Sequence, residues 1–285
     1  MRFNLKDILN TELYPLHEPE GPAYEELVKH SRNLFLAEGS VTLQDFLRPE
    51  AVTAAVANID VNMTNAWNTD GEHNIFLDTG DPEYLENHIR NQRFHTKVSS
   101  LAYDMLDPEG PLSTLYRDDN FREFLRLVLG VDKLFRLEDP LGALSVNIFQ
   151  PGDRHSWHFD QSSHSVTIML QKPDAGGHFR KTGQIRRTRH DKSEELFSVL
   201  NEVIQNENEQ DMEKNKEHEE TNSKSVKTLK FDPGTLSIFS GSTSLHKVTC
   251  VHGTRSRQVA VLCYATRQGK KNSPEVQKLF WGRVK

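Results

Sequence analysis

The chain has 285 residues, 35% of them hydrophobic, which is enough to bury one sizeable core, so we expect a single domain over residues 1–285. The formal net charge of -6 and the isoelectric point of about 6.1 argue against a nucleic-acid binder, because phosphate-binding proteins usually carry a basic excess. No apolar run approaches the length of a membrane span, which argues against a membrane protein.

The cysteines and the amino terminus indicate a compartment. Cys250 and Cys263 lie in apolar surroundings typical of strands and have no CxxC partner, so we predict buried thiols in a reducing environment rather than zinc ligands. Residues 1–16 lack the basic, apolar and small-residue order of a secretory signal. We therefore predict a cytoplasmic protein with no membrane partner, and the sequence carries no signal for an oligomeric state.

The amino-terminal half is predicted to be mostly helical. Residues 1–21 carry few order-forming signals, and we expect them to form a surface arm. Residues 22–37 predict an amphipathic helix that Gly39 ends, and residues 40–43 predict an edge strand. A second helix is predicted to open at Pro49.

The next segment allows two interpretations. Residues 60–80 are rich in Asn, Asp and Gly, and they form either an irregular loop over the mouth of a site or an ordinary connection. A helical pattern then runs from Asp81 towards Met105, and another begins at Asp119 and stops before Gly130.

Strands dominate from Leu134 onward, with one long interruption. A helical layer backing an antiparallel sheet follows from this order, so the predicted fold class is α+β. Within the interruption, residues 180–189 are basic and form either a solvated loop or part of the site. A capping box at Asp191 predicts a helix, and residues 206–225 predict a mobile charged insertion, because they have almost nothing to bury.

The most informative stretch begins at Asn147, ends at Leu170, and contains the triplet His158, Phe159, Asp160. An apolar run and a Pro-Gly turn precede this triplet, and an alternating strand follows it. Because residues i and i+2 of a strand point to the same face, the imidazole of His158 and the carboxylate of Asp160 can converge on one metal ion.

Two further residues complete the set. His246 stands at the start of a later strand, and Arg257, eleven positions on, opens the final apolar strand. Arg255 is the neighbouring candidate, and we prefer Arg257 because it has the same strand parity as Val259 and Val261.

This set, an HxD triplet followed by a distant His and an Arg that opens a final strand, resembles the non-haem iron(II)- and 2-oxoglutarate-dependent oxygenases. The resemblance implies a double-stranded β-helix, or jelly roll, backed by helices from the amino-terminal half. It implies that His158, Asp160 and His246 bind Fe(II) and form the catalytic centre, leaving positions for 2-oxoglutarate and O2.

The cosubstrate contacts follow from the same resemblance. The far carboxylate of 2-oxoglutarate needs a fixed cation, and the planar guanidinium of Arg257, or else of Arg255, matches it in two parallel hydrogen bonds. Thr167 and Asn147 are assigned to the same cosubstrate, although a strand Thr is also simply a good β-former.

A closer resemblance is carried by the elements EDPLGAL, PGDRHSWHF and AGGHF within residues 137–179, by FLRPEAV before them, and by residues 231–264. These look like the carrier-independent group that acts on free amino acids and contains both halogenases and hydroxylases. In the halogenases a small residue replaces the carboxylate so that chloride can bind the iron, whereas Asp160 is present here. The resemblance therefore implies hydroxylation of an unactivated C–H bond of a free amino acid, with release of succinate and CO2.

Three residues are predicted to contact the substrate. His155 lies three positions before His158 and by strand parity points to the other face, so it is either a surface histidine or a substrate contact. Glu138 either pairs with a substrate ammonium, which would favour a basic amino acid, or is an exposed strand-end residue. Trp281 either closes the pocket, as the resemblance implies, or simply packs near the terminus.

Two alternatives stay open. An oxygenase acting on a protein or nucleic acid would use the same iron site, and only the basic residues 180–189 favour it. A non-catalytic jelly-roll binding protein is expected to lack an iron ligand or the cosubstrate arginine, but all four residues are present.

Overall fold

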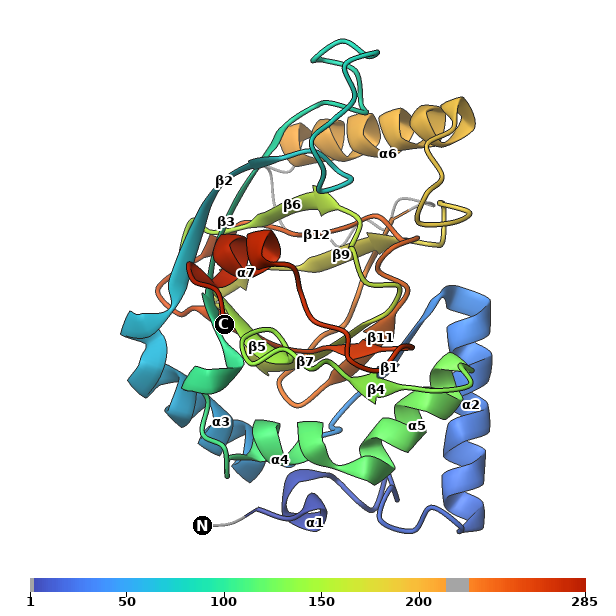
Figure 1. Ribbon diagram of the computed structural model, residues 1–285, viewed down its shortest axis with the longest axis vertical. Coiled ribbons are helices and arrows are strands. Elements are labelled where there is room, and N and C mark those ends of the chain that lie inside the picture. The colour runs from blue at the N-terminus through green and yellow to red at the C-terminus, as the bar shows by residue number, and fades with distance from the viewer. Residues whose placement is uncertain (1–2, 214–225) are drawn as a thin grey trace.

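The computed structural model describes residues 3–213 and 226–285, and Figure 1 shows its architecture. Its helices are α1 (Leu5–Ile8), α2 (Pro22–Glu38), α3 (Pro49–Asn62), α4 (Pro111–Arg117), α5 (Asp119–Leu129), α6 (Glu194–Glu213) and α7 (Pro274–Trp281), with 3-10 turns η1 (Met63–Asn65) and η2 (Tyr103–Met105). In this part of the chain, no helix combines the length and the apolar character needed to cross a membrane.

Two antiparallel sheets form the centre of the molecule. The larger has the order β1 (Ser40–Leu43), β11 (Leu236–Phe239), β7 (Ser165–Gln171), β14 (Arg257–Leu262), β5 (Leu144–Phe149), β3 (Phe94–Leu101), β2 (Trp67–His73). The smaller has the order β10 (Val226–Thr228), β9 (Phe179–Thr182), β12 (His246–Val248), β6 (His155–His158). Two short pairs join β13 (Val251–His252) to β8 (Ala175–Gly176) and β15 (Tyr264–Ala265) to β4 (Phe135–Arg136).

The alternation of side chains on β7 shows how the layers stack. Val166 and Ile168 point outward into the main core, which they share with residues of α2, α3, α4 and α5. Met169 points inward and packs with Phe179 and Val248 of the smaller sheet. The two sheets therefore face each other, as in a jelly roll, and the helices of the amino-terminal half cover the outer face of the larger one (Figure 1). The predicted α+β class and double-stranded β-helix are confirmed.

Helix α6 covers the smaller sheet on its outer side (Figure 1). Leu196 and Leu200 of the helix pack with Trp157 and Leu245 of the sheet region, so the helix predicted after Asp191 is confirmed. The helix continues to Glu213, so residues 206–213 of the predicted charged insertion are helical, and its mobility stays a prediction. Residues 206–213 contain three Glu, one Gln and one Met, which are good helix formers even without an apolar stripe. Residues 214–225 of that prediction lie outside the described residues.

Several predicted boundaries are confirmed because they depend on local backbone chemistry. Helix α2 starts at Pro22 and ends at Gly39, whose φ of 66° is in the left-handed region that favours glycine. Helix α5 starts at Asp119, where the carboxylate of Asp118 accepts the backbone N–H of Phe121, and ends at Gly130. Strand β1 lies at the edge of the larger sheet, as expected.

The helix predicted from Asp81 towards Met105 is wrong. Residues 94–101 form β3, in which Thr96, Val98 and Ser100 are the buried inner positions. Because two of these are polar, the alternation of a strand is hidden from a hydrophobic pattern. Within residues 60–80, for which a loop over the site and an ordinary connection were both open, residues 67–73 instead form β2 at the sheet edge, where most of the polar residues are exposed.

The surface arm expected for residues 1–21 is also wrong. Ile8, Leu9 and Leu16 are fully buried in the main core, and a backbone bridge joins Leu9 to Leu47. The short helix α1 is closed by a capping box between Asn4 and Asp7, so a turn of helix exists where the sequence offered little periodicity.

Leu9→Ala is expected to lower the free energy of unfolding by about 2–5 kcal/mol, because it leaves a cavity in the core. Leu13→Ala is the matched control, since Leu13 is 55% exposed, and its effect is expected to stay within about 0.5 kcal/mol. Urea unfolding of both variants measures the difference. Equal effects would show that the amino-terminal segment does not belong to the core.

Candidate metal centre and active site

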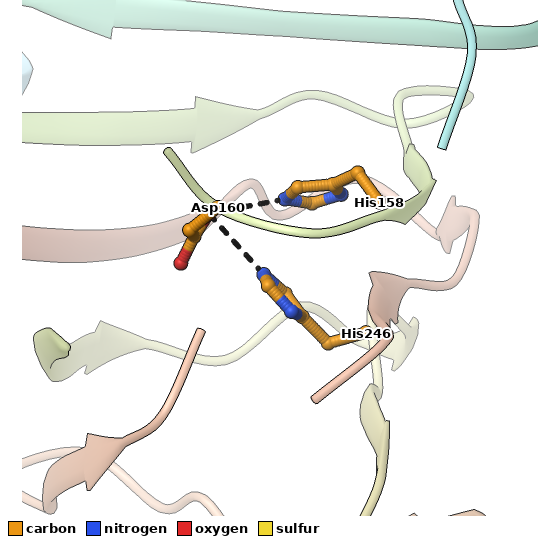
Figure 2. A group of neighbouring side chains, drawn as sticks. All are labelled: His158, Asp160 and His246. Carbon is orange, nitrogen blue, oxygen red and sulfur yellow. Dashed lines mark ion pairs between the residues drawn. The ribbon is translucent and has the colours of Figure 1, made fainter. Parts of the chain in front are cut away.

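Three side chains from one end of the β6–β12 pairing, at the edge of the smaller sheet, converge on one point (Figure 2). His158 ends β6 and His246 begins β12, and these two residues are direct cross-strand partners. Asp160 follows two residues after His158, and its Oδ1 lies 3.5 Å from Nε2 of His158 and 3.4 Å from Nε2 of His246. One ligand atom from each residue lies within 4.8 Å of the other two.

Both imidazoles are held with Nε2 towards the carboxylate. Nδ1–H of His158 donates to the carbonyl of Ser156 at 2.8 Å, and Nδ1–H of His246 donates to the carbonyl of Ser244 at 2.9 Å. Since a carbonyl only accepts, each Nδ1 carries the proton and each Nε2 has its lone pair free for a metal.

The electrostatics favour a charged Asp160 carboxylate beside a neutral His158 imidazole. Burial alone would raise the pKa of Asp160, but the facing imidazoles of His246 and His158 outweigh it and hold this pKa well below its ordinary value. Burial, together with the neighbouring His246, lowers the pKa of His158. For Asp160 and His158, the protonation states that bind a metal are therefore the ones that their surroundings favour.

The spacing suits one ion. Metal–nitrogen and metal–oxygen bonds of about 2.1 Å at neighbouring coordination positions separate the ligand atoms by roughly 3 Å. The observed 3.4 and 3.5 Å need only a small contraction. Two imidazoles and one carboxylate are the donor set that leaves open positions on iron(II).

A buried cation lies on the inner face of the larger sheet. Arg257 is 1% exposed, and its Nε and Nη1 have no hydrogen-bond partner among the described residues. Its guanidinium carbon lies 5.3 Å from the ring centre of Phe149 and 5.9 Å from that of Phe231. Burial lowers the pKa of Arg257 to about 9, so this cation lacks the counter-charge that a bound carboxylate would supply.

Arg255 has a different environment. Its side chain is 56% exposed and lies 3.7 Å from Asp174, whose carboxylate also accepts its backbone N–H. The two candidates for the cosubstrate arginine therefore differ: Arg257 is buried, whereas Arg255 is exposed and lies beside Asp174.

Asn147 and Thr167 lie on the same inner face as Arg257. Asn147 is the cross-strand partner of Val259, and Thr167 is the partner of Val261 and Ser237. Both residues are partly exposed although β5 and β7 are interior strands, so the space between the sheets is open at this level. Oδ1 of Asn147 accepts from the hydroxyl of Ser100 at 3.0 Å.

The predicted direction of His155 is wrong. Its ring stacks on that of His158 with centres 3.7 Å apart and planes 15° from parallel. An irregularity in the β6–β12 register turns the strand between these residues, so positions i and i+3 share a face. Desolvation, followed by the neighbouring His158, lowers the pKa of His155 well below its ordinary value.

His73, at the end of β2, is a residue that the sequence did not single out. Its ring lies edge-on to His155 at 5.7 Å and to His158 at 6.0 Å. Its Nδ1–H donates to the carbonyl of Asn74, and its Nε2 accepts from the hydroxyl of Thr96 at 2.6 Å. Burial lowers the pKa of His73 to about 4, so a neutral ring supports the histidine stack. The only signal was its place at the end of a polar segment.

Glu138 contacts the carboxyl-terminal segment, and Trp281 belongs to it. Glu138 is exposed, and its carboxylate accepts the backbone N–H of Gly269 at 3.1 Å. Trp281 is 8% exposed, packs with Leu141, and has no partner for its indole N–H among the described residues. Within the described part of the chain, no hydrogen bond or ion pair joins either residue to the three converging side chains.

One residue of the basic segment 180–189 packs directly behind the triplet of His158, Phe159 and Asp160. Arg186 is 6% exposed, and its guanidinium carbon lies 4.9 Å from the ring centre of Phe159 and 5.0 Å from that of Phe76. Its Nε donates to the carbonyl of Asp191 at 3.0 Å. This arginine therefore packs against the back of the candidate metal centre.

Solved structures with the same fold cover most of the chain. AviO1 from Streptomyces viridochromogenes Tue57 has a TM-score of 0.53 at 13% identity, covering 86% of this chain and 97% of that chain. HygX from Streptomyces hygroscopicus, solved with nickel, 2-oxoglutarate and hygromycin B, has a TM-score of 0.52 at 12% identity, covering 85% and 88%. The carbocyclase SnoK from nogalamycin biosynthesis has a TM-score of 0.54 at 14% identity, covering 84% of each chain. At such identities the likeness shows the fold alone.

The jelly roll, with two imidazoles and a carboxylate converging at one end, is the arrangement of the iron(II)- and 2-oxoglutarate-dependent oxygenases, and the chain is an enzyme of this class. No curated protein matches the chain. The family model described as Halogenase D matches residues 23–281, and the chain belongs to this family. The prediction of an enzyme rather than a non-catalytic binding protein is confirmed.

Proposed function

We propose that the enzyme hydroxylates an unactivated C–H bond of a free amino acid, with succinate and CO2 as the other products. The observation that carries this proposal is the position of Asp160, whose Oδ1 faces Nε2 of both His158 and His246. A carboxylate there completes a three-ligand set and occupies the place that chloride would need on the metal. Hydroxylation rather than halogenation follows from that occupancy, although the family takes its name from halogenases.

The polar side chains at the metal centre and on the inner face of the larger sheet have separate roles in this proposal. His158, Asp160 and His246 hold Fe(II), and Arg257 receives the far carboxylate of 2-oxoglutarate in a desolvated pocket where the pair is strong. Asn147 and Thr167 line the space between these two groups and orient the cosubstrate. When bound, iron(II) with 2-oxoglutarate and O2 supplies the oxidation that converts C–H to C–OH. The chain positions the substrate carbon and limits the access of water.

The substrate side of the site is assigned to His155, Glu138 and Trp281. His155 supports this assignment most directly, since its ring lies against the metal-ligand candidate His158 and is partly exposed. Glu138 would pair with the ammonium of a basic amino acid, and Trp281 would cover the substrate and offer it an indole N–H that has no partner among the described residues. The burial of Arg186 removes one basic side chain from the surface that a macromolecular substrate would use.

The experiment is succinate release by the iron-loaded enzyme with 2-oxoglutarate, tested against free amino acids, then peptides, then oligonucleotides. We expect stimulation by an amino acid and a product heavier by one oxygen atom in mass spectrometry. Stimulation only by peptides or oligonucleotides would contradict the substrate class but not the reaction. A chlorinated product would contradict the argument from Asp160.

A further inference from the structure

The two carboxylate oxygens of Asp160 have different surroundings. Oδ1 faces Nε2 of His158 and His246, where the metal is expected. Oδ2 points away and accepts a hydrogen bond from the hydroxyl of Ser165. Ser165 is the first residue of β7 and the cross-strand partner of Phe239, so the interior of the larger sheet fixes the place of its hydroxyl.

Gly241 closes the other side of the same carboxylate. Its carbonyl accepts the backbone N–H of Asp160 at 3.0 Å, which brings the two chains close together. A Cβ added at Gly241 would overlap Oδ2 of Asp160, and it would lie only 2.6 Å from Oγ of Ser165 and 2.8 Å from Cγ of Asp160. A residue without a side chain is therefore required for the carboxylate to keep this orientation.

We propose that Ser165 and Gly241 are positioning residues that make Asp160 a ligand through Oδ1 alone. This inference rests on the proposed iron site. A carboxylate can bind a metal through one oxygen or through both. Binding through both would fill one of the positions that an octahedral ion with three protein ligands keeps open. The two chelating oxygens of 2-oxoglutarate and O2 need all of these positions, so the hydrogen bond to Oδ2 keeps the site able to take its full set of reactants.

The test is Ser165→Ala, with Ser237→Ala as the matched control. Ser237 lies on the neighbouring strand, is fully buried, and has no hydrogen-bond partner for its hydroxyl among the described residues. Cobalt(II), added without O2, serves as the probe because its visible absorption depends on its coordination number. We expect Ser165→Ala to bind cobalt(II) with an altered spectrum, and its affinity for 2-oxoglutarate to fall about 10- to 100-fold, the usual effect of losing a residue that orients a ligand. Ser237→Ala should match the parent protein in both measurements.

The results separate this proposal from the one on which it rests. If the parent protein does not bind cobalt(II) at all, the proposed iron site fails. If Ser165→Ala keeps both the parent spectrum and the parent affinity for 2-oxoglutarate, the iron site stands and the role of Ser165 is wrong. Complete loss of metal binding by a folded Ser165→Ala, with folding checked by circular dichroism, would also overturn the proposal. The hydroxyl would then be needed for Asp160 to bind the metal at all, not only to restrict it to Oδ1.

A second variant tests the other side of the carboxylate. Gly241→Ala is expected to displace Asp160 and weaken cobalt(II) binding about 10- to 100-fold. In the Asp160→Gly background the carboxylate is gone, and the same change should have little further effect on metal binding. Equal losses in both backgrounds would mean that Gly241 acts on the fold rather than through Asp160, and would overturn its assigned role.

Discussion

Asp160→Gly is expected to lower kcat/KM for hydroxylation by more than about 100-fold, which exceeds the usual effect of losing a residue that only orients a ligand. The side chain supplies the one negative charge among the three converging groups, and its pKa is held well below the ordinary value, so this charge is present at neutral pH. Without it, the two imidazoles alone must hold the metal. Formation of the hydroxylated product, measured by mass spectrometry, reports the loss.

Asp70→Gly is the control for this substitution. Asp70 is a half-exposed carboxylate on β2 that pairs with His95, so its removal alters charge without touching the centre. Its activity is expected to match the parent enzyme within about twofold, in line with surface substitutions of about 0.5 kcal/mol or less. If Asp160→Gly keeps more than a tenth of the activity, Asp160 is not a metal ligand.

The candidate centre could be predicted from the sequence because each part carries a local signal. The HxD spacing fixes a shared direction for His158 and Asp160, since one residue intervenes in an extended chain. His246 begins the short strand β12 and Arg257 begins the apolar strand β14, and both positions can be recognised in the sequence. The sequence did not give the pairing of β6 with β12, which makes His158 and His246 direct partners, because register is a long-range property.

Three differences between the sequence pattern and the structure have physical causes. Parity does not predict the direction of His155, because it holds only for a regular strand and β6 is irregular between His155 and His158. Strand β3 lacks an apolar alternation because its inner face carries Thr96 and Ser100, whose hydroxyls bond His73 and Asn147 instead of packing in the core. The amino-terminal segment looked unstructured because single apolar residues such as Leu9 and Leu16 are buried by distant elements, and no periodic pattern announces such contacts.

Arg257→Ala is expected to raise the apparent Michaelis constant for 2-oxoglutarate strongly. Truncating one partner of a buried, hydrogen-bonded charge pair costs about 2–5 kcal/mol, which corresponds to roughly 30-fold to several thousand-fold in affinity. Arg257 fits this case because it is 1% exposed and two of its nitrogens have no partner in the described part of the chain. Initial rates of succinate formation at varied 2-oxoglutarate concentration give the constant.

Arg255→Ala is the matched control, since it removes the same chemical group two residues away from an exposed position beside Asp174. We expect the Michaelis constant of this variant to change by less than about twofold, as for a surface ion pair. Arg257→Lys should recover only part of the affinity, because an ammonium cannot form the two parallel hydrogen bonds of a guanidinium. A large effect at Arg255 with none at Arg257 would move the cosubstrate anchor by two positions, and the two Arg257 nitrogens that lack a partner among the described residues would then need a different ligand.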